Sequence, residues 1–503
     1  MQIQATVRKN QYHDSVRLMQ ISRQAGELAG VTKVLALLGT DSNKKILMDL
    51  GIMDETIGAA TPNDLIICIE AESSEASQAA MDDVDARLKT VSSSDRTREE
   101  KPKSLEEAVR MLPGANFAMI SLPGQFAKLD VVTALEQRLN VMLFSDNISM
   151  KDEVELKRLA IEKGLLLMGP DCGTAIVNGV PLGLANVVRR GDIGIAAASG
   201  TGIQEVTCLI DGFGGGISHA IGVGGRDLRK EIGGAMMCQA IRILAKDPNT
   251  KKLILLSKPG APDAMNRVLD EARASGLEVV SCLLGCDNDE YACAGMTLVS
   301  TLEEAAFAAM GKEIPEMEFT DALRKRRDGL NPQRKYLRGL YSGGTLCYET
   351  LFILKNDLDI HSNVAIKPEL KLHYPAKGTA HYCMDLGEDE FTQGRPHPII
   401  DLGLRLEWLR EEMADPAVKV ILMDLVLGYG ANRNPGTDLT RVLNECRNGL
   451  PDGGPLVFVH VCGTENDPQK ASYQQALLDE AGVFAFSTNA QAARASLAAL
   501  RDE

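Results

Sequence analysis

Short apolar or β-branched runs alternate with longer amphipathic stretches along most of the chain. The runs have the length of buried strands, and the stretches between them carry apolar residues at helical spacing. The predicted strands are Val31–Leu38, Asp64–Ile69, Phe117–Ser121, Val141–Phe144, Leu165–Met168, Ile193–Ala197, Leu253–Leu256, Val279–Leu284, Val418–Met423, Leu456–Val461 and Val483–Phe486. The clearest predicted helices are Ser15–Leu28, Lys128–Leu139 and Asp152–Lys163. Strand–helix–strand alternation predicts an α/β fold with parallel sheets and right-handed crossovers.

Two stretches interrupt this alternation. Ser92–Ser104 is polar and charged, and it predicts a mobile loop inside the first domain. Gly311–Arg338 carries Pro315, Pro332 and the basic run Arg324–Arg327, and it predicts a linker between two α/β regions. A solvated run of charge in a linker explains these basic residues more simply than an anion site does.

The sequence also resembles itself in two places. Ile195–Glu205 and Gly339–Glu349 each contain an apolar lead-in, a Ser/Gly/Thr turn, and an expected helix with a glutamate a few residues in. Each of the two opens a further stretch of α/β pattern. The repeat therefore predicts two related modules.

The composition is that of a soluble globular protein. Its 503 residues suggest two to four domains, and 45% hydrophobic with 24% charged residues is ordinary for that class. The net charge of −15 argues against nucleic acid or an anionic membrane surface as a partner, because both would be repelled. A small anionic substrate stays open, since it needs only a local positive site.

Cysteine and leader patterns predict a cytoplasmic location. The 11 cysteines include no C-x-x-C pair, which favours free thiols in a reducing compartment. The first residues contain no apolar stretch of a signal peptide, and no run of 18 apolar residues predicts a membrane span. The seven histidines fall in no metal-binding spacing, so we expect no metal site.

Two Ser/Gly/Thr turns are the strongest candidates for chemistry. Each precedes an expected helix, where unpaired backbone N–H groups and the helix dipole favour an anion. The candidate phosphate-binding residues are Ser199, Gly200, Thr201, Gly202, Ser342, Gly343, Gly344 and Thr345. An ordinary N-cap turn explains either motif alone. If the two modules face each other, however, both helix starts would point at one phosphate.

Three further loops have the composition of binding loops. Gly222–Asp227 is glycine-rich and contains Arg226, whose guanidinium can bind phosphate or carboxylate in a bidentate fashion. Gly39–Lys44 has a similar character, although neither a G-x-G-x-x-G nor a P-loop motif is present. Tight turns without a ligand explain these glycines equally well. A long polar loop after the strand at 418–423 predicts an active-site loop, whose candidate residues are Gly428, Gly430, Asn432 and Arg433.

Three motifs in this order resemble the α subunit of succinyl-CoA synthetase. They are Gly169–Gly173, Gly194–Thr201 and Ile221–Arg226. Ser121–Lys128 and Phe144–Asn147 resemble the CoA-domain segments of that subunit. Together the motifs cover much of the first 310 residues, so the resemblance concerns a fold and not an isolated loop.

The rest of the chain extends the resemblance. Asp401–Gly403 and the loop at Gly428 resemble the carboxyl-terminal domain of the β subunit, and the layout is most similar to the FdrA proteins, which are acyl-CoA synthetase-like. This resemblance implies a Rossmann-like CoA-binding-type domain over 1–168, a flavodoxin-like succinyl-CoA synthetase (CoA-ligase) domain over 169–310, a linker over 311–338 and a second such domain over 339–503. It also implies CoA or nucleotide-type positions at Gly39, Lys44, Pro123 and Cys172.

The chain departs from the synthetases at the centre of their chemistry. Where they have His-Ala-Gly, with the histidine that becomes phosphorylated, this chain has Cys293-Ala294-Gly295. Where they have a glutamate that orients that histidine, this chain has Lys258. Both halves of the relay are replaced, so ATP-driven CoA ligation by this chain alone is not expected. The resemblance leaves Lys258, Arg226 and Cys293 as catalytic candidates by position.

A lysine beside a phosphate site would stabilise an anion, as a reaction with free phosphate or an acyl phosphate requires. FdrA-type proteins occur with two partner proteins in the oxamate carbamoyltransferase of allantoin catabolism, which is part of purine degradation. The resemblance implies that role here: a subunit that handles phosphate and carbamoyl phosphate in the phosphorolysis of oxalurate to oxamate. The implied partners are other carbamoyltransferase subunits in a hetero-oligomer, a second copy in a homodimer, or both.

Two alternative functions stay open at the level of sequence. One is a subunit of an ADP-forming, succinate-CoA ligase-like acyl-CoA synthetase, for which CoA would be a ligand. The other is a non-catalytic assembly subunit that kept the fold and lost the chemistry. The missing histidine argues against the first, and the retained Ser/Gly/Thr turns argue against the second.

Overall fold

The computed structural model describes residues 2–11, 13, 15–26, 28–40, 43–44, 47–48, 51–89, 102–286, 295–317, 319–373, 380–392, 395–450 and 453–501. The chain divides into two compact units, Met1–Lys101 and Pro102–Glu503. No helix within these described ranges is long and apolar enough to cross a membrane.

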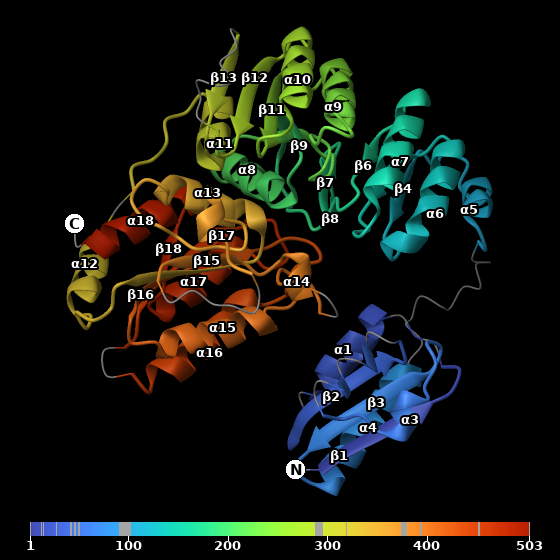
Figure 1. Ribbon diagram of the computed structural model, residues 1–503, viewed down its shortest axis with the longest axis vertical. Coiled ribbons are helices and arrows are strands. Elements are labelled where there is room, and N and C mark those ends of the chain that lie inside the picture. Colours follow the sequence, from blue (N-terminus) through green and yellow to red (C-terminus); the bar gives the residue numbers. More distant parts are fainter. Residues whose placement is uncertain are drawn as a thin grey trace. The chain divides into compact units, whose positions relative to one another are not determined.

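The first unit is built on an antiparallel sheet with the strand order β1-β3-β2 (Figure 1). Its elements are β1 (Gln2–Arg8), α1 (Ser15–Gly26), β2 (Val31–Leu38), α3 (Glu55–Gly58), β3 (Leu65–Ala71) and α4 (Ser74–Lys89). Leu18, Ile21 and Ala25 recur at helical spacing on α1 and are buried in the core of this unit. Helix α1 packs against α4 and β2.

This arrangement corrects one boundary predicted from the sequence. A single Rossmann-like domain was expected over residues 1–168, but among the described strands β1, β2 and β3 pair only with one another, and they belong to a unit that ends at residue 101. The parallel part of the expected domain therefore begins at residue 102. Of the loop predicted near 92–104, residues 92–101 lie outside the described residues.

The second unit begins with a short parallel sheet in the order β4-β5-β6. Its elements are α5 (Leu105–Met111), β4 (Phe117–Ile120), α6 (Gly124–Glu136), β5 (Asn140–Leu143), α7 (Met150–Glu162) and β6 (Leu167–Met168). Helices α6 and α7 pack against each other, and α7 also packs against helix α9 of the next sheet. These strands therefore share a core with the region that follows.

The next sheet has the strand order β13-β12-β11-β9-β10-β7-β8. Strands β9 to β13 run parallel, while β7 and β8 form an antiparallel hairpin at one edge. The elements are β7 (Thr174–Val177), β8 (Val180–Gly183), β9 (Arg190–Ala197), α8 (Gly200–Gly212), β10 (Ile217–Gly222), α9 (Ala235–Lys246), β11 (Lys252–Ser257), α10 (Pro262–Ala274), β12 (Glu278–Leu283), β13 (Met296–Val299) and α11 (Leu302–Met310).

The last sheet is parallel, with the order β15-β14-β16-β17-β18. Its strands are β14 (Tyr336–Tyr341), β15 (Tyr382–Asp385), β16 (Val418–Val426), β17 (Leu456–Cys462) and β18 (Phe484–Phe486). Its helices are α13 (Gly344–Leu354), the 3₁₀ turn η2 (Pro368–Leu370), α14 (Asp389–Thr392), α15 (Gly403–Ala414), α16 (Pro435–Arg447), α17 (Ala471–Glu480) and α18 (Asn489–Arg501).

The predicted linker contains a helix of its own. Helix α12 (Asp321–Asp328) carries the basic run, and Thr320 caps its start. Two of the guanidinium groups, on Arg324 and Arg327, lie over the ring of Phe319. Two arginines of this basic run therefore contact an aromatic ring, which the sequence pattern alone did not indicate.

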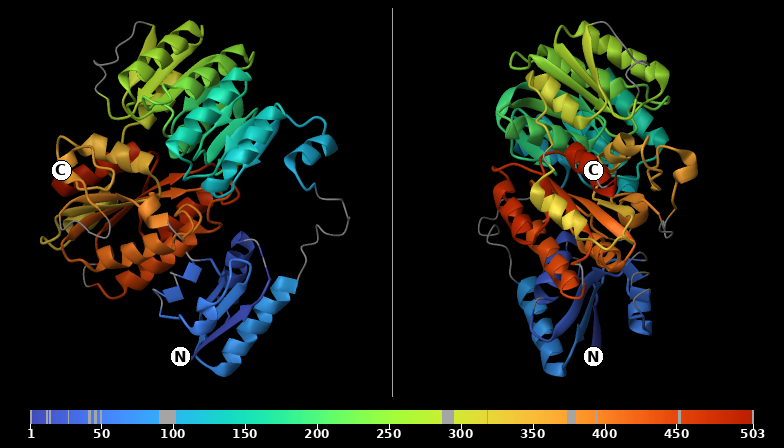
Figure 2. Two further views of the ribbon diagram at one scale, coloured as in Figure 1. Left: turned by 45° about the vertical axis from the view of Figure 1, so that its right-hand side comes forward. Right: turned by 90° about the vertical axis from the view of Figure 1, so that its left-hand side faces the viewer.

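The two larger α/β modules share one hydrophobic core. Buried side chains of α8 and α13 belong to the same cluster, together with residues of α11 and α18. Helix α13 packs against α8 and α18, and α11 packs against α8. Both views of Figure 2 show these green and orange-to-red parts side by side. The modules therefore meet along α8 and α13, the two helices that begin with the repeated Ser/Gly/Thr turns.

Candidate functional site

A cavity of about 970 Å³ lies where the two repeated turns meet. It is lined by the starts of α6, α8, α10 and α13, by the carboxyl ends of β4, β5 and β15, and by loops after β10 and β11. In α/β folds ligands bind where loops follow the carboxyl ends of parallel strands. This position makes the cavity the candidate functional site.

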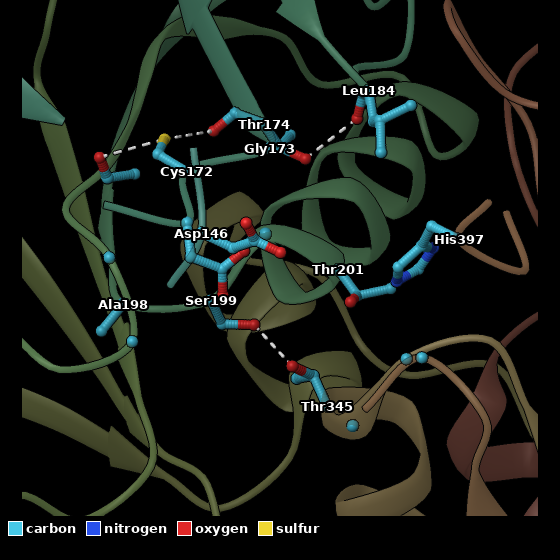
Figure 3. Close-up of a pocket in the computed structure, with 18 of the residues that line it drawn as sticks. Asp146, Cys172, Gly173, Thr174, Leu184, Ala198, Ser199, Thr201, Thr345 and His397 are labelled. Carbon is cyan, nitrogen blue, oxygen red and sulfur yellow. Dashed lines mark hydrogen bonds between the residues drawn. The ribbon is translucent and has the colours of Figure 1, made fainter. Parts of the chain in front are cut away.

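The starts of α8 and α13 touch inside this cavity. Ser199 caps α8 by accepting a hydrogen bond from the Gly202 N–H at 3.0 Å, and its Oγ lies 2.6 Å from Oγ1 of Thr345 (Figure 3). A Cβ on Gly343, the N-cap of α13, would lie 2.7 Å from Oγ1 of Thr201. Each helix start is thus packed against a threonine of the other, as expected of two related modules.

Four helix starts contribute to the wall. Those of α6, α10 and α13 have no side-chain cap, and their N-cap residues are Pro123, Ala261 and Gly343. The first turn of a helix leaves backbone N–H groups without helical partners and carries a partial positive charge. Four such starts around one cavity favour an anionic ligand.

Lys258 places an ammonium group near the α13 start. Its Nζ lies 4.8 Å from the centre of the Tyr348 ring and 3.7 Å from the point that a Cβ on Gly344 would occupy. Lys258 forms no ion pair within the described ranges, so its charge is available to a ligand. Exposed Arg229 and Arg395 also line the cavity.

Carboxylates line the same cavity. Asp146, Asp171 and Glu388 are exposed, whereas Asp385 is only 3% exposed. Burial, with a contribution from the charge of Glu388, raises the pKa of Asp385 to about 7, although the Gly387 N–H donates to its Oδ1 at 2.9 Å. Near neutral pH this carboxyl is therefore poised between its acid and its base form.

His397 faces the cavity as a neutral imidazole. Burial lowers its pKa to about 4, and its Nδ1 accepts a hydrogen bond from the Ile399 N–H at 3.2 Å. The proton of the neutral ring therefore sits on Nε2. The close-up in Figure 3 shows His397 in the group that contains Thr201, Ser199 and Thr345. This ring can donate one hydrogen bond to a ligand oxygen.

The structure brings most of the predicted phosphate motif together. The predicted residues that line the cavity are Ser199, Gly200, Thr201, Gly343, Gly344, Thr345, Lys258, Pro123 and Cys172. Gly202 lies just behind the wall, in the first turn of α8, where its N–H is taken by the cap. Cys172 is 3% exposed, and burial raises the pKa of its thiol to about 12, so it is a packed thiol and not a nucleophile.

Ser342 does not line the cavity, which corrects its prediction as a phosphate ligand. It is fully buried, and both its N–H and its hydroxyl donate to Asp424. The same carboxylate is paired with the buried guanidinium of Arg405 at 2.8 Å. The N-cap position of α13 belongs to Gly343, one residue later, so Ser342 supports the core below the site.

Arg226 is likewise committed elsewhere. Its Nε lies 2.8 Å from Glu153, which also pairs with buried Lys157, and Lys157 in turn pairs with Asp227. This network ties α7 to the glycine-rich loop after β10. The guanidinium that reaches the cavity from this loop is that of Arg229.

The remaining predicted residues do not join the site. Gly428 and Gly430 pack against the loop after β8, and Asn432 accepts hydrogen bonds from the Asn434 N–H and from the Gln469 side chain. None of these residues nor Arg433 lines the cavity. Gly39 and Lys44 belong to the first unit. Cys293 lies outside the described residues.

Asp385 and His397 are site residues that the sequence reasoning missed. Asp385 ends β15 and is followed by Leu386 and Gly387, which is the pattern of a loop at the carboxyl end of a parallel strand. The predicted strands did not include β15, so this signal was not used. His397 had no sequence signal at all.

One cluster of three buried side chains places possible metal-ligand atoms close together. Oxygen, nitrogen and sulfur atoms of Glu205, His460 and Cys462 lie within 4.8 Å of each other. His460 Nε2 is 2.5 Å from Glu205, and its Nδ1 is 3.1 Å from the Phe486 carbonyl. The negative charge of Glu205 raises the pKa of His460 against the effect of burial. Both ring nitrogens thus have protein partners, and the group acts as a buried ion pair between α8 and β17.

Comparison with known proteins agrees with the fold. The family described as CoA-ligase matches residues 340–499, and the family described as AllF, heavy metal-associated domain, matches residues 1–104. The chain is 40% identical over 499 residues to the uncharacterized protein YahF of Escherichia coli (strain K12), with 97% of each protein covered. It is 29% identical over 166 residues to the α subunit of ADP-forming succinate–CoA ligase of Aquifex aeolicus (strain VF5). That match covers 32% of this chain and 53% of the subunit.

Fold and comparisons define an acyl-CoA synthetase-like protein with a succinyl-CoA synthetase type of architecture. The chain belongs to the same family as YahF. It spans about half the length of the succinate–CoA ligase subunit that it matches. A solved structure, that of PH0766 from Pyrococcus horikoshii OT3, is similar with 16% identity and a TM-score of 0.34, over 77% of this chain and 84% of that one.

The residues of the first unit do not fit a thiolate site for a heavy metal. Cys68 is the sole cysteine in the sequence of residues 1–104 and lies buried in β3. Burial raises the pKa of its thiol to about 11. Cysteine binds metals as the thiolate, and a soft metal ion usually takes two or more such ligands. The name of the matching family therefore assigns no metal chemistry to this unit.

Proposed function

We propose that this chain handles phosphate in a carbamoyltransferase, where it binds inorganic phosphate and carbamoyl phosphate at the junction of α8 and α13. The observation that carries the proposal is the contact of the two helix starts through Ser199 and Thr345, with Lys258 beside them. The reaction is the phosphorolysis of oxalurate to oxamate and carbamoyl phosphate, and other carbamoyltransferase subunits are the proposed partners.

The hydroxyls at the junction supply a donor for the anion. Ser199 Oγ already accepts from the Gly202 N–H, and it shares one hydrogen bond with Thr345. Two hydroxyls that share one hydrogen bond keep one further O–H proton for a ligand. The start of α13, which has no side-chain cap, lines the same cavity. Dipoles fixed in this way bind an anion without reorganising first.

Lys258 distinguishes this site from a phosphohistidine relay. The synthetases that the sequence resembles have a glutamate at this position, and a glutamate would repel a phosphate bound between the helix starts. The ammonium of Lys258 instead stabilises it, and no protein carboxylate lies within ion-pair distance among the described residues. A positively charged wall suits a reaction in which phosphate itself is the nucleophile.

The transfer breaks one bond and forms one. An oxygen of bound phosphate attacks the carbamoyl carbon of oxalurate, and the bond from this carbon to the internal nitrogen breaks to release oxamate. Between the attack and the breaking of the carbon–nitrogen bond, negative charge develops on the carbamoyl oxygen. Donors on the cavity wall, the Nε2–H of His397 among them, are placed to stabilise such charge, and one donor of this kind contributes about 10²–10³ in rate.

A second candidate is CoA binding, as in an ADP-forming acyl-CoA synthetase. The cavity continues past the helix junction to the ends of β4 and β5, where Pro123 and Ser145 line it. Its volume of about 970 Å³ exceeds what phosphate and oxalurate fill. This extension favours a larger ligand, while the replacement of both relay residues argues against ligation by the chain alone.

Calorimetry on the purified full-length chain separates the two candidates. Inorganic phosphate, carbamoyl phosphate and CoA are offered separately to the wild type, to Lys258→Met and to Lys251→Met. Lys251 is 73% exposed and serves as the matched control. We expect both phosphates to bind the wild type and the control equally, and Lys258→Met to lose about tenfold or more in affinity. CoA binding without phosphate binding favours the synthetase function, and no binding of either phosphate refutes the proposal.

A further inference from the structure

We propose that Asp385 is the acid–base catalyst of this site, taking a proton from bound phosphate and passing it to the leaving nitrogen. This inference rests on the function proposed above, and it names the residue that transfers the proton in that reaction. Asp385 lines the cavity from the end of β15, beside the start of α13.

The two carboxylate oxygens of Asp385 have different surroundings. Oδ1 accepts the Gly387 N–H at 2.9 Å, which fixes the plane of the carboxyl group. Oδ2 has no hydrogen-bond partner within the described part of the chain, and it lies 2.5 Å from the point that a Cβ on Gly344 would occupy. The glycine, which has no Cβ, thus lets this oxygen lie close to the first residue of α13.

Lys258 also lies next to the first residue of α13. Its Nζ lies 3.7 Å from the same Cβ point on Gly344. A phosphate held by the α13 start would therefore meet an ammonium and a carboxyl oxygen together. The ammonium stabilises the bound anion, and the carboxyl exchanges a proton with it. The two residues play different parts, and neither replaces the other.

The backbone holds Asp385 in place without consuming Oδ2. Its N–H donates to Asn363 Oδ1 at 2.9 Å, and its carbonyl accepts from Asn363 Nδ2 at 2.8 Å. This pair of bonds anchors the end of β15 to the loop before it. A buried carboxyl with a fixed backbone, one satisfied oxygen and one oxygen facing the cavity has the geometry of a general base.

The proton balance of the reaction fits one group that acts twice. Hydrogen phosphate gives up its O–H proton to Oδ2 as its oxygen bonds to the carbamoyl carbon. When the bond from that carbon to nitrogen breaks, the same proton passes from Asp385 to the nitrogen of oxamate. The carboxyl returns to its starting state, and no further acid, base or cofactor is needed. Burial supports this role, since it raises the pKa of Asp385 to about 7.

Sulfate tests the placement of Asp385 without any catalysis, because it stays a dianion between pH 6 and 8 whereas phosphate titrates. The charged groups that face Asp385 are Lys258, Glu388 and Asp424. If Oδ2 borders the anion, ionised Asp385 repels it. The ionised fraction rises from about a tenth at pH 6 to about nine tenths at pH 8, so sulfate should bind about tenfold more weakly at pH 8.

Asp385→Asn should remove this pH dependence, and Glu349→Gln is the matched control. Burial also raises the pKa of Glu349 to about 7, but Glu349 lies among α8, α11 and α18 and does not line the cavity. The control should keep the wild-type profile. A profile that stays unchanged in Asp385→Asn overturns the placement of Asp385, whereas a wild type that binds no sulfate at any pH overturns the anion site itself.

Turnover tests the proton transfer. Oxalurate and phosphate are followed by ¹³C and ³¹P NMR with the full-length chain and its variants. Asp385→Asn should bind phosphate within about threefold of wild type at pH 6 and lose about 10²–10⁴ in rate, the usual share of a general acid–base group. Asp385→Glu should recover part of that rate. Wild-type rates in Asp385→Asn would overturn the assignment of this residue and leave the phosphate site standing.

Discussion

Ser199 and Ser342 look alike in the sequence but should respond to mutation in opposite ways. Ser199 lies at the cavity wall, caps α8 and touches Thr345. Ser342 is fully buried and donates twice to Asp424. We predict that Ser199→Ala weakens anion binding, and that Ser342→Ala weakens only the fold.

The magnitudes follow from the bonds that each change removes. Ser199→Ala removes an N-cap, which costs about 1 kcal/mol of stability. It also removes half of the hydroxyl pair that faces the anion; a hydrogen bond to a charged group contributes about 1.5–3 kcal/mol, or about 10- to 150-fold in affinity. Ser342→Ala removes one bond to a buried carboxylate, for about 1.5–3 kcal/mol of stability. The bond from the Ser342 N–H and the ion pair with Arg405 remain.

Two measurements on the same preparations separate the effect of each variant on phosphate affinity from its effect on stability. Calorimetric titration with phosphate gives the affinity, and denaturant unfolding gives the stability of each variant. We expect Ser342→Ala to bind phosphate within about twofold of wild type, although it is the less stable of the two variants. If Ser342→Ala lost as much phosphate affinity as Ser199→Ala, the placement of Ser342 behind the wall would be wrong, and with it the reasoning from burial.

Three further outcomes follow from the packing and the charges. Gly343→Ala should separate the two helix starts and weaken phosphate binding by about tenfold or more, while Gly212→Ala, with open space around its Cβ, should have no effect on titrations. Lys157→Met leaves buried Asp227 without an ion pair and Glu153 with Arg226 alone, and it should lower the free energy of unfolding by about 3–5 kcal/mol, against less than about 1 kcal/mol for Lys128→Met at a partly exposed site, as denaturant curves will show. Burial raises the pKa of Glu349 from 4.5 to about 7, so the folded state holds a proton that the unfolded chain releases. The free energy of unfolding should therefore fall by about 3 kcal/mol as pH rises from about 5 to 8, and Glu349→Gln should remove this loss. An unchanged pH slope in Glu349→Gln would contradict the prediction.

The sequence located most strands from their apolar runs, which bury alternate residues of β2 and every residue of β16. Strand β2 coincides with the predicted Val31–Leu38, and β16, which is buried along its whole length, contains the predicted Val418–Met423. The predicted strands did not include β1, β7, β8, β10, β13, β14 and β15. Of these, β7, β8, β13 and β15 are only four residues long, and β7 and β8 pair as a hairpin at the sheet edge, where the apolar signal is weak.

The repeat determined the junction of the helix starts, but not which residues face it. Two similar turns before two helices predicted related modules, and these modules share one core along α8 and α13. Whether a hydroxyl points into the cavity or into the core depends on where the helix begins. In α13 that point is Gly343, which turns Ser342 away and brings Thr345 to Ser199. A shift of one residue rotates a side chain by about 100°, which composition does not reveal.

The sequence alone determined the α/β class, the two related modules and the anion-favouring helix starts, since these follow from local periodicity and turn chemistry. Only the tertiary structure decided that residues 1–101 form a separate antiparallel unit, because strand pairing is a long-range choice. It also decided which charges are free. Arg226 is held by Glu153, whereas Lys258 and Asp385 face the cavity from different modules. Their chemistry depends on burial and on neighbours distant in the chain, and only folding brings those neighbours together.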